Sequence, residues 1–157
     1  MKKMMKNRKG FTLMEMLIVV AIIAILVIIA IPTFNSALAK ARAATDVANI
    51  RSGYAAAQVE AMTNGLTDKT NGDKYVLEAD GSVTKGTATK AYTTQGESSK
   101  AAAGSSIGGK FDVGSTASGT TIAWSKGQTV TYVVKDTDGD GVPTVESITA
   151  ANAASGK

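Results

Sequence analysis

Residues 9–32 read KGFTLMEMLIVVAIIAILVIIAIP, an apolar segment with a single acidic residue, Glu15, near its start. Between Phe11 and Ile31 the polar residues are Thr12 and Glu15 alone. A helix of this length rises about 30 Å, which matches the hydrocarbon thickness of a bilayer. The segment is therefore predicted to span a membrane, with one ionisable side chain that needs a partner there.

The sequence around this segment supplies a cation for Glu15 only if the chain is cut. Five basic residues precede Gly10, but no Lys or Arg occurs between Phe11 and Lys40. Cleavage after Gly10 would create a new α-amino group on Phe11, about one helical turn from Glu15. A processing site between Gly10 and Phe11 is therefore the simplest way to pair the carboxylate.

The tetrapeptide GFTL at 10–13, then Glu15, then an aliphatic helix ending near Pro32, resembles the leader and transmembrane helix of type IV prepilins. The resemblance implies that a prepilin peptidase cuts between Gly10 and Phe11 and methylates the new N-terminus at Phe11. It also implies that the Glu15 carboxylate meets the Phe11 amine of a neighbouring subunit during assembly and sets the register between helices.

The same resemblance implies a structural protein rather than an enzyme. The expected function is that of the major pilin of a type IV pilus, a helical homopolymer for adhesion, twitching motility or related surface functions. The expected partners are other copies of the chain, the prepilin peptidase, the assembly platform, minor pilins and, before assembly, the cytoplasmic membrane. The assembled fibre would be extracellular. The alternative within this class is a pseudopilin of a type II secretion or competence system.

Two plainer interpretations of the N-terminal region stay open. One is a secretory signal peptide, because a basic start, an apolar run and the small residues of Ala37-Leu38-Ala39 fit a cleavage site before Lys40. Its apolar run is, however, longer than such peptides need, and it carries a carboxylate. The other is an uncut anchor whose basic start stays in the cytoplasm.

Composition narrows the classes of function. The chain has 17 basic and 13 acidic residues, and five of the basic ones lie in residues 1–10. Residues 11–157 therefore hold 12 basic and 13 acidic residues, a balance that does not indicate nucleic-acid binding. The chain has no Cys and no His, which excludes disulfides and Cys–His or Ser–His–Asp catalysis. A membrane-anchored enzyme or binding domain is therefore the distant alternative.

The predicted fold class is α+β, a long N-terminal helix packed on a small antiparallel sheet. Its expected parts are a cleaved leader at 1–10, a membrane and filament-core half-helix at 11–32, an amphipathic half-helix at 33–64 and a β-rich head at 65–157. Pro32 is expected to kink the helix, because it removes one backbone hydrogen bond.

The second half of the helix shows an apolar stripe at steps of three and four, which can pack on a sheet. Charged residues mark its solvent side, and Asn64-Gly65 is a typical helix end. The stripe comprises Val47, Ile50, Tyr54, Ala57 and Ala61, and the charged residues are Lys40, Arg42, Asp46, Arg51 and Glu60.

The head is expected to hold a hairpin around Asp80-Gly81 and a C-terminal hairpin region of antiparallel strands. Between them lies a variable loop at about 86–120, of which 88–109 is expected to have weak structure. The strands are predicted at Tyr75–Lys85 for the first hairpin and at Thr121–Lys126, Gln128–Lys135 and Pro143–Thr149 for the second region, with a frayed tail at Ala150–Lys157.

An acidic turn separates the last two predicted strands. Asp136, Asp138 and Asp140 stand at alternate positions, with Gly139 and Gly141 allowing a sharp turn, an arrangement of carboxylates that Ca²⁺ prefers. The full helix–loop–helix calcium pattern also wants a Glu at position 147, where this chain has Ser147. A calcium site, which the resemblance to pseudopilins supports, and a plain acidic β-turn are both left open.

Overall fold

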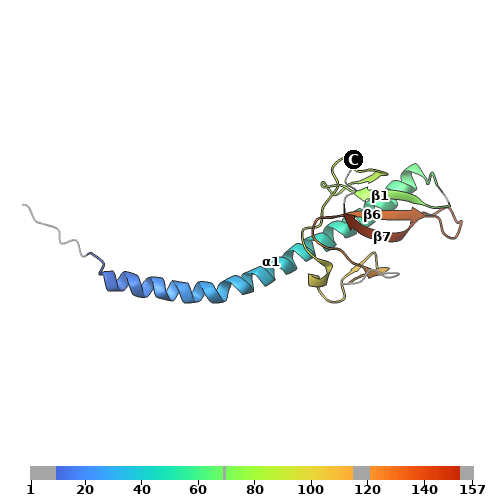
Figure 1. Ribbon diagram of the computed structural model, residues 1–157. Coiled ribbons are helices and arrows are strands. Elements are labelled where there is room, and N and C mark those ends of the chain that lie inside the picture. The colour runs from blue at the N-terminus through green and yellow to red at the C-terminus, as the bar shows by residue number, and fades with distance from the viewer. Residues whose placement is uncertain (1–9, 69, 115–120, 153–157) are drawn as a thin grey trace, which may run out of the picture. The chain divides into compact units, whose positions relative to one another are not determined.

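A computed structural model describes residues 10–68, 70–114 and 121–152. Its first element is the helix α1, Leu13–Asn64, which continues through Pro32. Gly65 follows with φ +70°, the left-handed conformation that ends helices at glycine. The chain divides into two compact units, residues 1–37 and 38–157, and Figure 1 labels α1 and three strands of the second unit, β1, β6 and β7.

The main sheet has four antiparallel strands in the order β2-β1-β6-β7. Tyr132 of β6 stands opposite Tyr75 on one side and Ile148 on the other. The predicted hairpin around Asp80-Gly81 is confirmed, because β1 and β2 pair across that turn. The strands are β1 Asp73–Leu77, β2 Val83–Lys85, β6 Gln128–Lys135 and β7 Thr144–Asn152.

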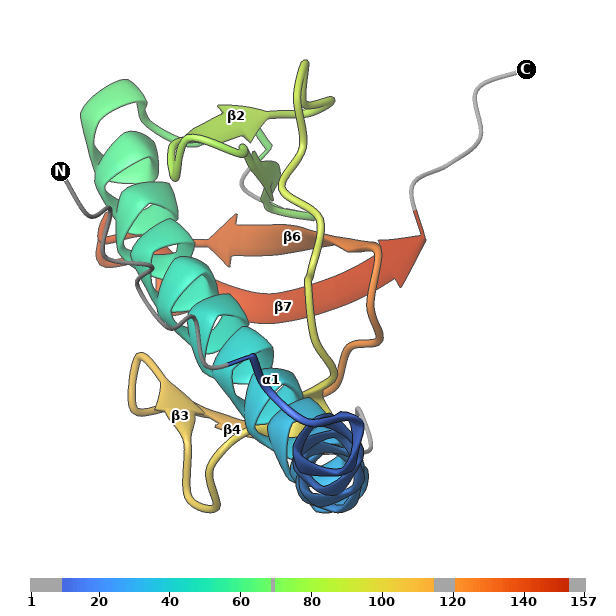
Figure 2. The same ribbon diagram turned by 90° about the vertical axis from the view of Figure 1, so that its left-hand side faces the viewer.

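The globular unit is an α+β fold in which the helix packs on this sheet, as predicted, and in Figure 2 the helix lies across β6 and β7. Val47, Ile50, Ala57 and Ala61 of the predicted stripe are buried, whereas Tyr54 is half-buried. Gly53 stands where a side chain would collide with the Tyr132 ring, so the helix approaches β6 closely there. The Tyr132 hydroxyl donates a hydrogen bond of 2.9 Å to the Ile50 carbonyl.

Three short strands form a second sheet, β3-β4-β5, which corrects the prediction for Thr121–Lys126. That segment contains only the short strand β5, which pairs in parallel with β4 rather than joining the C-terminal antiparallel sheet. After β5 the chain turns so that Trp124 is buried against the helix. The strands are β3 Ser106–Ile107, β4 Phe111–Val113 and β5 Thr121–Ile122.

The segment predicted as a weakly structured loop at 88–109 is ordered by backbone hydrogen bonds. Thr94 exchanges them with the turn before β6, through N–H to the Gln128 carbonyl at 2.9 Å and through its carbonyl from Gly127 at 2.8 Å. Thr94 and Ser98 are buried, and a short 3₁₀ turn, Ser98–Lys100, follows. The segment 88–109 is rich in Gly, Ser and Thr, small residues that let its backbone lie close to the rest of the unit. Surface loops have the same composition, so composition alone does not distinguish the two. Residues 115–120 of the expected variable loop lie outside the described residues.

Two further predictions are wrong. β7 extends to Asn152, so Ala150 is paired in the sheet, opposite Val130, rather than frayed. Residues 153–157 of the expected tail lie outside the described residues. Asp46, predicted on the solvent side of the helix, is fully buried.

Candidate functional site

The predicted processing site lies just before the helix. Gly10 and Phe11 are both exposed, and Phe11 has 81% of its surface accessible. No other part of the described chain comes within 4 Å of a side chain placed at Gly10. A peptidase would therefore meet this peptide bond without displacing described residues.

Thr12 and Glu15 are joined at the start of α1 by three hydrogen bonds that run in both directions. The Glu15 N–H donates to the Thr12 hydroxyl oxygen at 3.2 Å. The Thr12 N–H and hydroxyl both donate to Oε2 of Glu15, each at 2.8 Å. This is a capping box, which satisfies backbone donors that the first helical turn leaves free. This role of Thr12 was not predicted, although the Thr-x-x-Glu spacing is the signature of a capping box.

The capping box leaves Glu15 suited to a second contact, because all three bonds involve Oε2 or the backbone rather than Oε1. The expected contact with the Phe11 amine of another copy is consistent with this geometry. The contact itself stays a prediction.

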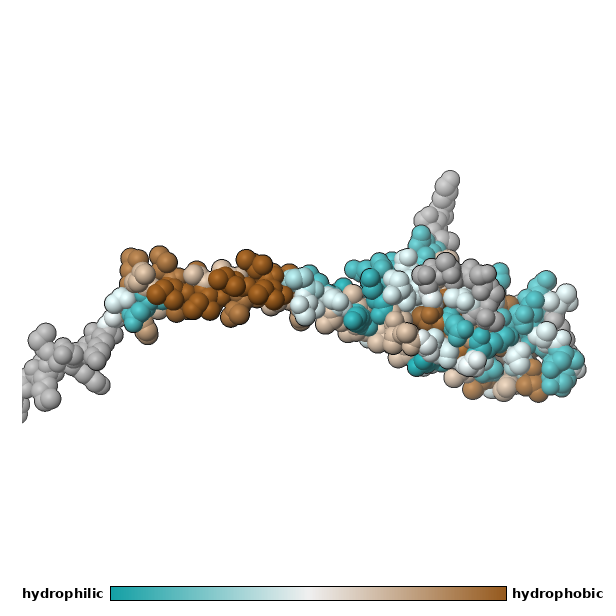
Figure 3. Space-filling view, turned by 90° about the horizontal axis from the view of Figure 1, so that it is seen from below, coloured by the Kyte–Doolittle hydropathy of each residue, from teal (hydrophilic) through white to brown (hydrophobic). Residues whose placement is uncertain are grey.

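The helix beyond Glu15 exposes large apolar side chains on all sides, and Figure 3 shows this part of the chain as a continuous hydrophobic band. The most apolar stretch of α1 has a mean hydropathy of 3.2, and none of its residues is buried. Length and composition therefore allow this helix to cross a membrane. The exposed set between Leu17 and Ile31 comprises Leu17, Ile18, Val19, Val20, Ile22, Ile23, Ile25, Leu26, Val27, Ile28, Ile29 and Ile31.

Pro32 lies inside α1 and is exposed. One residue on, the Thr33 hydroxyl donates to the Ile29 carbonyl at 3.3 Å, a bond within the same turn of helix. The predicted kink at Pro32 stays a prediction, because the continuity of the helix does not decide it.

The acidic turn brings its three carboxylates together as the sequence predicted. One oxygen from each of Asp136, Asp138 and Asp140 lies within 4.8 Å of the others. Asp136 accepts from the N–H groups of Gly139 at 2.9 Å and Gly141 at 3.2 Å. The ligand types fit a hard cation such as Ca²⁺, while the backbone bonds also fit a plain acidic turn.

The buried carboxylate of Asp46, which was predicted on the solvent side of the helix, connects several segments of the globular unit. Asp46 accepts hydrogen bonds from the Tyr92 hydroxyl at 2.6 Å and from the N–H groups of Gln95 at 2.8 Å and Gly96 at 2.7 Å. It also accepts from Nε1 of Trp124 at 3.1 Å. Burial, together with the hydrogen bond to Asp46, raises the pKa of Tyr92 to about 12. Asp46 thus ties α1 to two segments that are distant in sequence.

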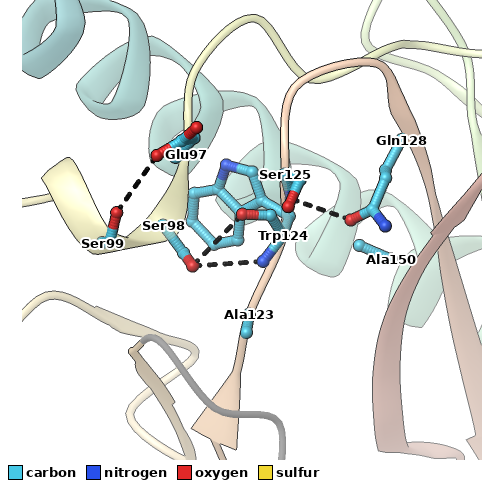
Figure 4. Close-up of a pocket in the computed structure, with 8 residues that line it drawn as sticks. All are labelled: Glu97, Ser98, Ser99, Ala123, Trp124, Ser125, Gln128 and Ala150. Atoms are coloured by element: carbon cyan, nitrogen blue, oxygen red, sulfur yellow. Dashed lines mark hydrogen bonds between the residues drawn. The ribbon is translucent and has the colours of Figure 1, made fainter.

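A polar hollow of about 380 Å³ lies beside this cluster (Figure 4). The Ser98 hydroxyl is held by Trp124, accepting from its N–H at 3.1 Å and donating to its carbonyl at 3.3 Å. Gln128 accepts from the Ser125 N–H at 2.9 Å. These hydrogen bonds join the lining segments to one another, and a further one runs from the Ser99 hydroxyl to Oε2 of Glu97 at 3.4 Å. The hollow is lined by Glu97, Ser98, Ser99, Ala123, Trp124, Ser125, Gln128 and Ala150.

Comparison with known families gives a match at the N-terminus. A family model described as the prokaryotic N-terminal methylation motif matches residues 5–31. No solved structure matches the chain. The motif and the apolar helix together suit membrane anchoring. The chain therefore carries the class III signal of type IV pilins, which supports a precursor of the type IV pilin or pseudopilin type.

Proposed function

We propose that this chain is the major subunit of a type IV pilus. A prepilin peptidase cuts between Gly10 and Phe11 and methylates the Phe11 amine. The processed subunit waits in the cytoplasmic membrane and is then polymerised by an assembly platform, with minor pilins, into an extracellular fibre for adhesion, motility or related surface functions. The observation that supports this proposal is the methylation motif at residues 5–31, which contains an apolar stretch of α1 whose large side chains are all exposed.

The exposed helix explains why membrane and fibre use the same surface. Burying one Leu, Ile or Val side chain is worth about 1.5–3 kcal/mol, so a dozen of them cannot remain in water. Lipid covers them in the subunit pool, and other copies of the helix cover them in the fibre. The transfer needs no exposure of this surface to water.

Glu15 makes the transfer from membrane to fibre selective for subunits in the correct register. In the fibre core a carboxylate without a cation would cost several kcal/mol, whereas the Phe11 amine of a correctly placed neighbour neutralises it. Oε2 is used by the capping box of Thr12, and Oε1 is the oxygen offered to the neighbour. Subunits in the wrong register are rejected because they leave the charge unpaired.

Processing is tested by replacing Gly10. We expect Gly10→Val to keep the chain at its full mass in the membrane fraction and to abolish fibres, whereas Lys9→Gln, its neighbour in the leader, is processed normally. Mass spectrometry of the membrane fraction distinguishes the two. Normal processing of Gly10→Val would contradict the proposed cut.

Fibre length separates pilus from pseudopilus. Electron microscopy of cells that express the chain at its natural level should show long surface fibres containing it. Fibres that appear only on overexpression, or stay within the cell envelope, would favour the pseudopilin of a secretion or competence system.

A further inference from the structure

A small apolar patch lies at the C-terminal end of α1. Within the described part of the globular unit, the exposed large apolar side chains are Val59, Met62 and Val142, with 62%, 54% and 45% of their surfaces accessible. Val59 and Met62 are three residues apart and so share one face of the helix. Val142 is close to Met62 along the chain's surface, because its neighbours Gly141 and Pro143 line one hollow together with Met62. Exposed apolar side chains grouped in this way suit an interaction surface.

This patch borders a groove of about 220 Å³. One wall comes from the last turn of α1 and the residues after it, and the other wall comes from the turn between β6 and β7. Val142 lies between two of the wall residues in sequence. The lining residues are Ala61, Met62, Gly65, Leu66, Asp136, Gly141 and Pro143.

The groove carries negative charge on both walls. The last turn of α1 has no basic residue to offset the partial negative charge of a helix C-terminus. On the other wall stands Asp136, with Asp138 and Asp140 beside it. The ion pairs recorded among the described residues, Lys85–Asp73 and Lys110–Glu146, do not involve these three carboxylates. The groove therefore fits an apolar side chain with a cation next to it.

The same chain offers a helix face of this kind. Phe34, Leu38 and Arg42 follow one another at steps of four in α1, which places them on one face. Phe34 has 67% of its surface exposed, Arg42 is exposed as well, and Leu38 between them is half-buried. Because no Lys or Arg occurs from Phe11 to Ala39, an apolar anchor nearer the N-terminus would have no cation beside it.

We propose that the groove at the end of α1 receives Phe34, Leu38 and Arg42 of a second copy of this chain. Phe34 and Leu38 would cover the apolar patch, and the Arg42 guanidinium would lie against the carboxylates of the acidic turn. The two surfaces are different patches of one chain, so the contact is heterologous and can repeat without closing. This proposal rests on the proposed function, since the fibre is where the copies meet.

Crosslinking tests the contact directly, because the chain has no cysteine of its own. The full-length double variant Phe34→Cys with Met62→Cys is expressed in the source cells, and sheared fibres are oxidised and run on a non-reducing gel. We expect a ladder that extends well beyond the dimer, since each copy is linked to two others. Either single variant can reach the dimer at most. The matched control pairs Phe34→Cys with Lys126→Cys, in an exposed turn outside the patch, and should give no ladder.

The outcomes separate this proposal from the proposed function. Fibres of the Phe34→Cys, Met62→Cys variant that give no ladder would overturn the groove contact and leave the fibre intact. Links from Met62→Cys to a different protein would overturn a second copy as the occupant. Absence of fibres from the unaltered chain would overturn the proposed function, and the groove proposal with it.

If the cysteine variant makes no fibres, exchanging the charges of Arg42 and Asp138 tests the groove contact instead. Asp138 is chosen because it is exposed and is not among the carboxylates that accept backbone hydrogen bonds in the turn. We expect Arg42→Glu and Asp138→Lys each to lower fibre yield at least tenfold, and the double variant to return it to within twofold of the unaltered chain. Lys126→Glu, the control, should leave the yield unchanged. Failure of the double variant to recover would overturn the proposed contact.

Discussion

The two parts of α1 have opposite relations to the rest of the molecule. None of the described residues before position 38 is buried, whereas seven residues between Ala43 and Ala61 are. The first part is apolar on every side, and the second is apolar along one stripe. A helix with one apolar stripe is covered by a single sheet, but a helix that is apolar all round needs surroundings on every side. The second part packs against the described sheet, whereas no described residue of the chain buries the first part.

The largest effect is expected from removing the charge of Glu15, the one charged residue of α1 before Lys40. We expect Glu15→Ala to leave membrane insertion intact and to abolish fibres, because the Phe11 amine of each neighbour then lacks its counter-charge. Electron microscopy and the yield of sheared protein measure the loss. Glu15→Gln is the matched variant, since its side-chain oxygen can still accept from Thr12 but carries no charge. Normal fibres from either variant would contradict the role of Glu15 in register.

In the second part of α1 the carboxylate of Asp46 has its hydrogen-bond donors within the chain. Asp46→Ala leaves four donors without their acceptor in a buried site, and we expect a loss of about 3 kcal/mol or more in the free energy of unfolding. Asp46→Asn should also destabilise, because its amide N–H₂ would face other donors. Trp124 is the only tryptophan, and its fluorescence reports this cluster directly during urea unfolding. An unchanged unfolding midpoint in Asp46→Ala would show that the cluster does not support the fold.

Alkaline pH should affect the globular unit through the same cluster. The pKa of Tyr92 is raised to about 12 in the folded chain, against about 10 for an unperturbed tyrosine. Stability is therefore fully present below pH 10 and falls as the pH rises towards 12, because only the unfolded chain then ionises readily. Burial raises the pKa of Tyr132 as well, so Tyr92→Phe should reduce the pH dependence without removing it. An equal slope in Tyr92→Phe, measured by urea midpoints at several pH values, would contradict this assignment.

The smallest effect is expected at the acidic turn. If Asp136, Asp138 and Asp140 bind Ca²⁺, millimolar calcium raises the melting temperature of the globular unit by a few degrees and EDTA reverses the change. Asp138→Asn should weaken the response, and Asp112→Asn, an exposed carboxylate in β4, should not. A melting curve that calcium and EDTA leave unchanged would favour the plain acidic turn.

Local patterns predicted those elements that depend on nearby residues. The apolar run gave the membrane-type helix, the steps of three and four gave the stripe from Val47 to Ala61, and Asp80-Gly81 gave the first hairpin. Each of these follows from periodicity or turn chemistry within a few residues.

Contacts between distant residues were not predicted. The charge of Asp46 predicts a solvent-facing residue, although Asp46 lies four residues before Ile50, in step with the buried stripe. Its donors at Gln95, Gly96 and Trp124 lie about fifty to eighty residues away, so no local pattern indicates them. Gly96 is small because its backbone lies against Ala43, where a Cβ would stand 2.7 Å from the Ala43 nitrogen. A Gly, Ser and Thr-rich composition is shared by surface loops and by segments that pack closely on a helix, so tertiary structure alone distinguishes them.

The most direct test of the account is the intact mass and N-terminal sequence of the protein sheared from the cell surface. The account predicts a chain that begins at methylated Phe11 and occurs in a high-mass fibre. A chain that begins at Lys40, or one that begins at Met1 and stays in the membrane fraction, would contradict processing and assembly together.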